Sequence, residues 1–300
     1  MKKRELGKSG IFVSEIGLGC MSLPDDLKAS QLIMDAAIDA GINFFDTADL
    51  YDGGKNEEIV GQALKGKRSE IILATKAGNK LNPGGDGWTW DASKAHIMDA
   101  VKKSLLRLGT DYIDLYQLHG GTMEDNVDET IEAFESLKKE GLIRQYGISS
   151  IRPNVIQRFL ANSSAISVMM QYSLLDRRPE EWFPMIQDAG ASVITRGTIA
   201  KGFLTAEGLT RAGKANGFVE YDAQELLQTV QTLSEQAEDL HAAAMAFVLD
   251  QQTVASALIG ARTVGQLLDS VIAYEKKVSQ HDINLLKSVV ATHQYKAHRL

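Results

Sequence analysis

A carboxylate, a phenol, an ammonium and an imidazole each follow a short apolar run in this 300-residue sequence. Asp46 ends one run and Tyr51 follows five positions later, while Lys76 and His119 end the next two runs. Taken singly, such an aspartate caps a helix, such a lysine is solvated and such a histidine packs in a core. Taken together, the four side chains are typical of a site for acid–base catalysis.

The chemistry that these side chains favour is proton donation to an oxygen that gains negative charge. A free phenol has a pKa of about 10, and a neighbouring ammonium lowers it by stabilising the phenolate. We expect Lys76 to supply such an ammonium and Asp46 to hold it in an ion pair. We expect the His119 imidazole to donate to a carbonyl oxygen and to fix its orientation. We therefore expect Tyr51 to protonate a carbonyl that receives hydride.

These four residues meet only if their strands are neighbours, and the order of elements predicts a fold that makes them so. Helical patterns of more than ten residues occupy 28–41, 93–109, 127–141 and 263–277. Between such patterns lie eight strand candidates: 14–19, 42–48, 70–76, 111–119, 143–149, 166–171, 191–196 and 255–260. Eight β-then-α units predict an α/β fold, a closed (β/α)8 TIM barrel, whose functional residues lie at the C-terminal ends of the strands.

Two additions to the barrel are expected, and one competing fold is disfavoured. Residues 4–6 and the turn after them predict an N-terminal β-hairpin, and 280–295 predict an extra C-terminal helix. No linker rich in Pro or Ser interrupts the chain, so we interpret 1–300 as a single domain. A doubly wound sheet usually carries a dinucleotide turn with three glycines, and the nearest candidate, at 17–19, lacks the third.

Composition excludes several other classes of protein. A net charge of -7 and a pI near 5.5 argue against nucleic acid as the partner. Cys20 is the only cysteine, which rules out an internal disulfide and a zinc site of paired cysteines and fits a cytoplasmic location. The six histidines have no metal-binding spacing, and no apolar run reaches the ~20 residues of a membrane helix. We expect a monomer, because no heptad pattern stands out.

Several separated motifs resemble those of the aldo-keto reductases, a family that includes channel β subunits. The similar segments are 46–64, 72–78, 111–121 and 141–150, and the resemblance extends from 6–22 to 258–271. It implies an NADPH-dependent reductase that converts small aldehydes or ketones to alcohols. Its tetrad of Asp, Tyr, Lys and His falls on Asp46, Tyr51, Lys76 and His119, with Tyr51 as the general acid.

The resemblance also implies an NADPH molecule extended over the barrel mouth. Ser149 and Gln171 would hold its carboxamide, and Arg262 would pair with its 2'-phosphate. The remaining expected contacts, from the nicotinamide to the adenosine end, are Gly19, Cys20, Met21, Asp46, Arg196, Gly197, Thr198, Ile199, Lys201, Gly260, Gln266, Asp269 and Ser270.

Some of these positions depart from the family pattern. Arg196 stands where many relatives carry an aromatic residue that stacks on the nicotinamide, and a planar guanidinium can stack similarly. Thr198 replaces the usual proline. Asp269 and Ser270 stand where the family has its adenine contacts, so weaker binding of the adenine is expected.

The substrate is expected to contact Tyr51 and His119, and two tryptophans offer further contacts. Trp88 and Trp90 lie in the glycine-rich loop at 79–91, where aromatic side chains suit an apolar or aromatic aldehyde. Packing of this loop onto the barrel is the alternative explanation of both tryptophans.

Two other functions remain open at this point. Lys76 could form a Schiff base, as in aldolases, although a nearby Asp46 favours the ammonium over the free amine that this needs. A non-catalytic or very slow NADP(H) sensor is the second alternative, and the chain has no extended interaction tail that would favour it.

Overall fold

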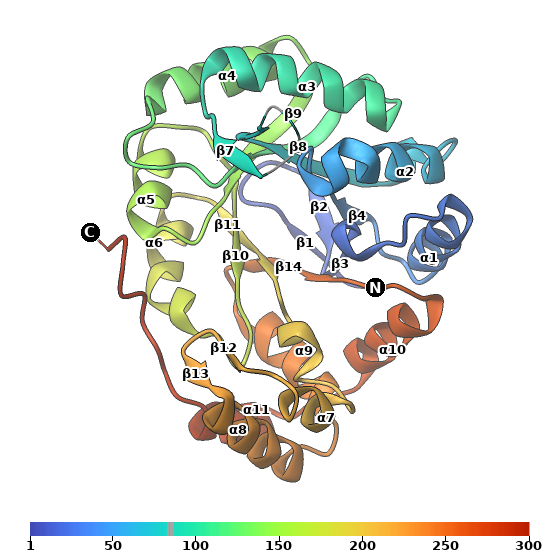
Figure 1. Cartoon of the computed structure of the whole chain (residues 1–300), viewed down its shortest axis with the longest axis vertical. Coiled ribbons are helices and arrows are strands. Elements are labelled where there is room, and N and C mark those ends of the chain that lie inside the picture. The colour runs from blue at the N-terminus through green and yellow to red at the C-terminus, as the bar shows by residue number, and fades with distance from the viewer. Residues whose placement is uncertain (83, 85–86, 300) are drawn as a thin grey trace.

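The computed structural model describes residues 1–82, 84 and 87–299, and a closed barrel of eight parallel strands lies at its centre (Figure 1). The barrel strands are β3 (Ile16–Gly19), β4 (Phe44–Asp46), β5 (Ile72–Ala77), β8 (Ile113–His119), β9 (Ile143–Ser149), β10 (Ser167–Gln171), β11 (Ser192–Arg196) and β14 (Val254–Ile259). Each overlaps one of the predicted ranges, and β14 pairs with β3 to close the barrel. The predicted (β/α)8 barrel is therefore confirmed.

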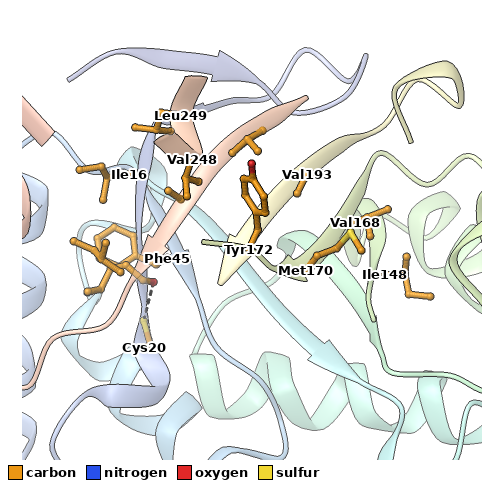
Figure 2. Packing of buried hydrophobic residues seen from close by; sticks show 14 of the residues in the cluster. Ile16, Cys20, Phe45, Ile148, Val168, Met170, Tyr172, Val193, Val248 and Leu249 are labelled. Atoms are coloured by element: carbon orange, nitrogen blue, oxygen red, sulfur yellow. Dashed lines mark hydrogen bonds between the residues drawn. The ribbon is translucent and has the colours of Figure 1, made fainter. Parts of the chain in front are cut away.

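The strands are apolar on both faces because each face meets a separate core. One cluster, which includes Phe44, Leu115 and Ile194, fills the barrel interior. The larger cluster lies between the strands and the helices, and Figure 2 shows Phe45 and Met170 within it. Burial on both sides is what produces near-continuous apolar runs in parallel strands.

The N-terminal hairpin closes the end of the barrel where the strands begin. It consists of β1 (Lys3–Glu5) and β2 (Phe12–Ser14), which pair antiparallel. Leu6 and Val13 are fully buried in the interior cluster, and Ser14 N–H donates to Asn43 Oδ1 just before β4. The hairpin thus leaves the opposite end of the barrel open for a site.

Helices surround the barrel (Figure 1). The α-helices are α1 (Leu27–Asp39), α2 (Lys55–Ala63), α3 (Lys94–Leu108), α4 (Val127–Lys139), α5 (Pro153–Ala161), α6 (Phe183–Asp188), α7 (Gly208–Ala212), α8 (Ala223–Gln236), α9 (Leu240–Asp250), α10 (Val264–Glu275) and α11 (Gln280–Val289). Short 3-10 helices are η1 (Cys20–Ser22), η2 (Tyr51–Gly54), η3 (Arg68–Glu70), η4 (Arg178–Trp182) and η5 (Ala200–Gly202). None of the helices in the described part of the chain is long and apolar enough to cross a membrane.

The predicted C-terminal helix is shorter than expected. Helix α11 ends at Val289, and Val290 is extended with φ -99° and ψ 139°. The residues after it follow the surface as a tail, in which Lys296 pairs with Glu220 and the His298 carbonyl accepts from Asn154 N–H. The apolar spacing of 280–295 therefore reflects two successive conformations, of which only the first is helical.

Two small hairpins were not predicted. One consists of β6 (Asn79–Leu81) and β7 (Trp88–Trp90), and the other of β12 (Gly217–Phe218) and β13 (Tyr221–Asp222). The first spans the predicted tryptophan loop, of which residues 83 and 85–86 lie outside the described part. Its strands have three residues each, too few for a reliable alternating pattern.

Gly61 shows how closely two of the surrounding helices approach. A Cβ atom at this position of α2 would lie 2.5 Å from the Leu108 carbonyl oxygen at the end of α3, and backbone atoms cannot move aside cheaply. We expect Gly61→Ala to lower the free energy of unfolding by about 1–3 kcal/mol, measured by urea denaturation.

Gly265→Ala is the matched control, because a Cβ there meets nothing nearer than 3.8 Å in the first turn of α10. The higher helix propensity of alanine should leave this variant as stable as the wild type or up to about 1 kcal/mol more stable. Equal destabilisation by the two substitutions would contradict the described packing.

Candidate active site

The four predicted acid–base residues lie together at the open end of the barrel. Asp46 is the last residue of β4, Lys76 is the penultimate residue of β5, and His119 is the last residue of β8. These strands are consecutive in the barrel, and Tyr51 begins η2 in the loop after β4. Chain segments more than seventy residues apart therefore meet because parallel strands end at the same rim.

Lys76 is the centre of this group. Its side chain is 1% exposed, and its Nζ donates to Asp46 Oδ1 at 2.5 Å, to the Thr47 carbonyl oxygen at 2.8 Å and to Tyr51 Oη at 3.2 Å. Asp46 accepts a further bond through Oδ2 from Gln117 Nε2 at 3.2 Å. All three donors of the ammonium thus have partners.

The charge of Lys76 follows from these contacts. Burial by itself lowers the pKa of Lys76, but the Asp46 carboxylate and the Tyr51 oxygen outweigh it and raise that pKa above its ordinary value. Burial raises the pKa of Asp46, which Lys76 and Gln117 oppose. Lys76 therefore keeps its proton, and a positive charge faces the Tyr51 oxygen.

A tight turn returns Tyr51 to the other three residues. Asp52, Gly53 and Gly54 have φ of 49°, 63° and 96°, a left-handed run that brings the chain from η2 into α2. The φ of 96° at Gly54 favours glycine, and a Cβ there would lie 2.9 Å from the Arg107 side chain, which would have to shift. The turn leaves the Tyr51 ring 5.0 Å from Lys76 Nζ, measured to the ring centroid.

His119 lies edge-on to Tyr51, with the ring centroids 6.1 Å apart and the planes at 89°. Burial, followed by the charges of Lys76 and Arg196, lowers the pKa of His119 to about 3. The imidazole is therefore neutral at physiological pH and carries one N–H donor. Such a ring can donate to a substrate oxygen without adding charge to the site.

A cavity of about 1660 Å³ opens beside these residues. Asp46, Tyr51, His119, Trp88 and Trp90 line it, and Lys76 lies behind them. Most of the expected cofactor contacts also line it: Gly19, Met21, Ser149, Arg196, Gly197, Thr198, Ile199, Lys201, Gly260, Arg262, Gln266, Asp269 and Ser270. The sequence prediction and the cavity therefore select nearly the same residues.

Two expected cofactor contacts do not line the cavity. Cys20 is fully buried, and its thiol points into the core with Sγ 3.7 Å from the Leu18 carbonyl oxygen (Figure 2). Gln171 lies behind Arg196, whose Nη1 donates to Gln171 Oε1 at 3.0 Å. The amide of Gln171 also donates to Asp176 Oδ2 at 2.8 Å.

The contacts of Gln171 belong to a longer chain of polar groups. Asp176 is 1% exposed and forms two hydrogen bonds with Arg178, at 2.7 and 2.8 Å. The Arg178 guanidinium lies 4.8 Å from the ring centroid of Tyr295 in the C-terminal tail. The side chains of Arg178, Asp176 and Gln171 thus connect the tail to Arg196 beside the cavity.

Sequence reasoning missed Gln117, Asp176 and Arg178. Gln117 had a usable signal, because it lies two positions before His119 on one strand and so shares its face. Asp176 and Arg178 lie in a charged segment, and such segments are common at protein surfaces, so nothing in the sequence indicated that they contact the site. Among the described residues, no group of three His, Cys, Asp or Glu side chains is arranged to hold a metal ion.

Comparisons with known proteins agree on one family. Residues 15–291 match the model described as the Aldo/keto reductase family. The uncharacterized oxidoreductase YqkF of Bacillus subtilis (strain 168) is 52% identical over 100% of both chains. An NADH-specific methylglyoxal reductase of Escherichia coli (strain K12) is 31% identical over 96% of this chain and 98% of that protein. The holo form of aldo-keto reductase AKR11C1 from Bacillus halodurans matches with a TM-score of 0.94 and 49% identity over 100% of each chain.

The buried neutral imidazole makes a testable prediction about stability. A histidine with its ordinary pKa of 6.5 takes up a proton in the unfolded chain, whereas folded His119 does not until about pH 3. The free energy of unfolding therefore falls as the pH drops below 6.5 and is regained above it. Relative to His119→Asn, the wild type should lose about 1 kcal/mol more between about pH 7 and about pH 5.5.

Urea denaturation of the two proteins at both pH values measures this difference. Parallel losses in the wild type and in His119→Asn would contradict the description of His119 as a buried neutral ring.

Proposed function

This chain belongs to the aldo/keto reductase family, and we propose that it reduces aldehydes or ketones to alcohols by hydride transfer from bound NADPH. Membership makes it an oxidoreductase; NADPH and the roles of individual residues belong to the proposal. The observation that carries it is the 3.2 Å contact between the buried Lys76 ammonium and Tyr51 Oη beside a large cavity.

In the proposed reaction the nicotinamide supplies a hydride to the carbonyl carbon when the cofactor is bound. Tyr51 Oη gives its proton to the carbonyl oxygen, so that one C–H and one O–H bond form and an alcohol leaves. Lys76 stabilises the negative charge left on the Tyr51 oxygen. His119 donates a hydrogen bond to the carbonyl oxygen and orients it.

The cavity residues fit a nicotinamide dinucleotide. Lys201 and Arg262 line the cavity, and neither has a carboxylate partner in the part of the chain that the structure describes. Gly260 and Ser22 line the same cavity, and the absence of a side chain at Gly260 leaves room for Ser22, whose Oγ would lie 2.5 Å from a Cβ there. Cations and exposed backbone are the groups that bind phosphates.

Arg196 takes a place at the nicotinamide in this proposal. Gln171 Oε1 holds its guanidinium, and Asp176 holds Gln171 in turn. A planar group fixed in this way can stack on the ring, as the aromatic side chain of many relatives does. Gln171 then acts on the cofactor partly through Arg196.

The choice of NADPH over NADH depends on Arg262. A relative that is 31% identical is named an NADH-specific methylglyoxal reductase, so family membership leaves the choice open. A guanidinium pairs well with the 2'-phosphate that only NADPH carries. Asp269 lines the same end of the cavity and opposes that preference.

Trp88 and Trp90 form the outer wall at the substrate end. Their rings lie 4.6 Å apart at 81°, and Trp90 packs on Gly120, where a Cβ would lie 1.7 Å from the indole. Packing of the loop onto the barrel and contact with the substrate are therefore compatible explanations, because Trp90 packs onto the barrel and also lines the cavity. An apolar or aromatic carbonyl compound suits this wall.

Tyr51→Phe tests the proposed acid. The substitution removes the phenolic hydroxyl and with it the donated proton, so turnover of a panel of aldehydes should fall by about 10²–10⁴-fold, measured by absorbance of the reduced cofactor. Tyr274→Phe, which removes a hydroxyl bound to Glu15 near the hairpin, is the matched control.

Fluorescence titration should show unchanged binding of NADPH by Tyr51→Phe. Turnover retained by this variant would refute the role of Tyr51. NADPH binding by the wild type without turnover of any carbonyl would favour the non-catalytic sensor.

Arg262→Ala tests the choice of cofactor. Loss of the guanidinium should raise KM for NADPH by about tenfold or more and change KM for NADH little, because only NADPH carries the 2'-phosphate. Steady-state kinetics with both cofactors measure the ratio. The phosphate contact would be ruled out if the wild type preferred NADH and Arg262→Ala left the ratio of KM for NADPH to KM for NADH unchanged.

A further inference from the structure

Most arginines of this chain pair with a carboxylate, and most of the others line the cavity. Eight of the twelve arginines form an ion pair with Asp or Glu. The other four are Arg152, Arg158, Arg196 and Arg262, all within the described part of the chain. Three of these four line the cavity, and Arg158 does not. A guanidinium without an acid in a cavity is suited to an anionic ligand.

Arg262 and Arg196 have places beside the cofactor in the proposed function, but Arg152 has none. It immediately precedes α5, next to the segment that follows His119. Its Nη1 donates to the Gly121 carbonyl oxygen at 2.9 Å, and its guanidinium lies 5.3 Å from the ring centroid of Trp90. These two contacts hold the side chain in place, and Nε and Nη2 have no hydrogen-bond partner among the residues that the structure describes.

The surrounding charges leave Arg152 uncompensated. Asp46 is the acid nearest the reaction centre, and Lys76 neutralises it. The other acids that line the cavity are Glu207, Glu238, Asp239 and Asp269, which lie beside α7, α9 and α10. Figure 1 places these helices across the barrel from β7. Among the described residues that line the cavity, the substrate end therefore carries arginines and no carboxylate besides Asp46. Asp125 lies beside Gly121 and accepts from Thr122 N–H, but it does not line the cavity.

We propose that Arg152 binds an anionic group, a carboxylate or a phosphate, on the part of the substrate remote from its carbonyl. The inference rests on the proposed function and narrows its substrate to carbonyl compounds that carry such a group. The carbonyl would lie at Tyr51 and His119, an apolar spacer on Trp90, and the anion on Nε and Nη2 of Arg152. A guanidinium edge with two free N–H groups matches the two oxygens of a carboxylate.

The test compares straight-chain ω-oxo carboxylates with the corresponding ω-oxo amides, which have nearly the same shape and no charge. The wild type should show a higher kcat/KM for the carboxylate, and the ratio should fall by about tenfold or more in Arg152→Gln. Arg152→Lys, which keeps the charge but not the fork, should restore part of the ratio. Phosphorylated aldehydes form a third set of substrates. Whichever anionic set, carboxylates or phosphates, loses more kcat/KM in Arg152→Gln identifies the anion that Arg152 binds.

Arg158→Gln is the matched control. Arg158 lies on α5, the helix that Arg152 precedes, and also donates through Nη1 to a carbonyl oxygen, that of Met123. Its substitution removes the same charge, but Arg158 does not line the cavity. The ratio of kcat/KM for the carboxylate to kcat/KM for the amide should be the same in Arg158→Gln as in the wild type. If this ratio fell equally in Arg158→Gln and Arg152→Gln, the preference for carboxylates would come from the net charge of the protein, which would overturn the proposal.

A binding measurement separates this proposal from the proposed function. Calorimetric titration of ω-hydroxy carboxylates into the wild type with NADP+ should give an affinity that Arg152→Gln lowers by about tenfold. A carboxylate that binds without any turnover of aldehydes would refute the reductase but support the anion site. Equal kcat/KM for carboxylates and amides in the wild type, or a preference kept by Arg152→Gln, would overturn the anion site alone. Weaker NADPH binding by Arg152→Gln would assign Arg152 to the cofactor and also overturn it.

Discussion

The rest of the site depends on an ammonium that is held inside the protein. Removing two charges from water is expensive, and an ion pair compensates for this only when its remaining donors and acceptors are satisfied. Here Asp46, the Thr47 carbonyl and Tyr51 accept hydrogen bonds from the three N–H groups of Lys76, and Gln117 donates to the other oxygen of Asp46. This arrangement fixes a positive charge beside a phenol at the rim of a cavity.

The barrel supplies the register that this ion pair needs. Asp46 pairs with Ala74 of β5, and Ala74 lies two residues before Lys76. Lys76 in turn pairs with Gln117 of β8, which lies two residues before His119. Residues two apart on a strand share a face, so the three strands present their polar groups to one another across the rim. A shift of one residue between any two strands would turn one member of the group toward the helices.

The sequence predicted the parts that follow from local pattern. Apolar runs with a polar last residue located Asp46, Lys76 and His119. Three of the predicted helical ranges end at a glycine, and the structure has a left-handed backbone there, with φ of 85°, 61° and 79° at Gly41, Gly109 and Gly141. Contacts between distant side chains left no local pattern, which is why Asp176, Arg178 and the tail beyond Val289 were missed. Arg152 was overlooked for the same reason, since only a count of carboxylate partners in three dimensions makes it unusual.

The central claim is that the charge of Lys76 allows Tyr51 to give up its proton, and the most direct measurement is turnover without that charge. Lys76→Met alone would leave Asp46 buried and unpaired, so the informative protein is the double variant Asp46→Asn with Lys76→Met, which removes both charges together. We predict that it folds, binds NADPH, and reduces aldehydes at least about a hundredfold more slowly than the wild type at neutral pH. Turnover by the folded double variant within about threefold of the wild type would contradict the account.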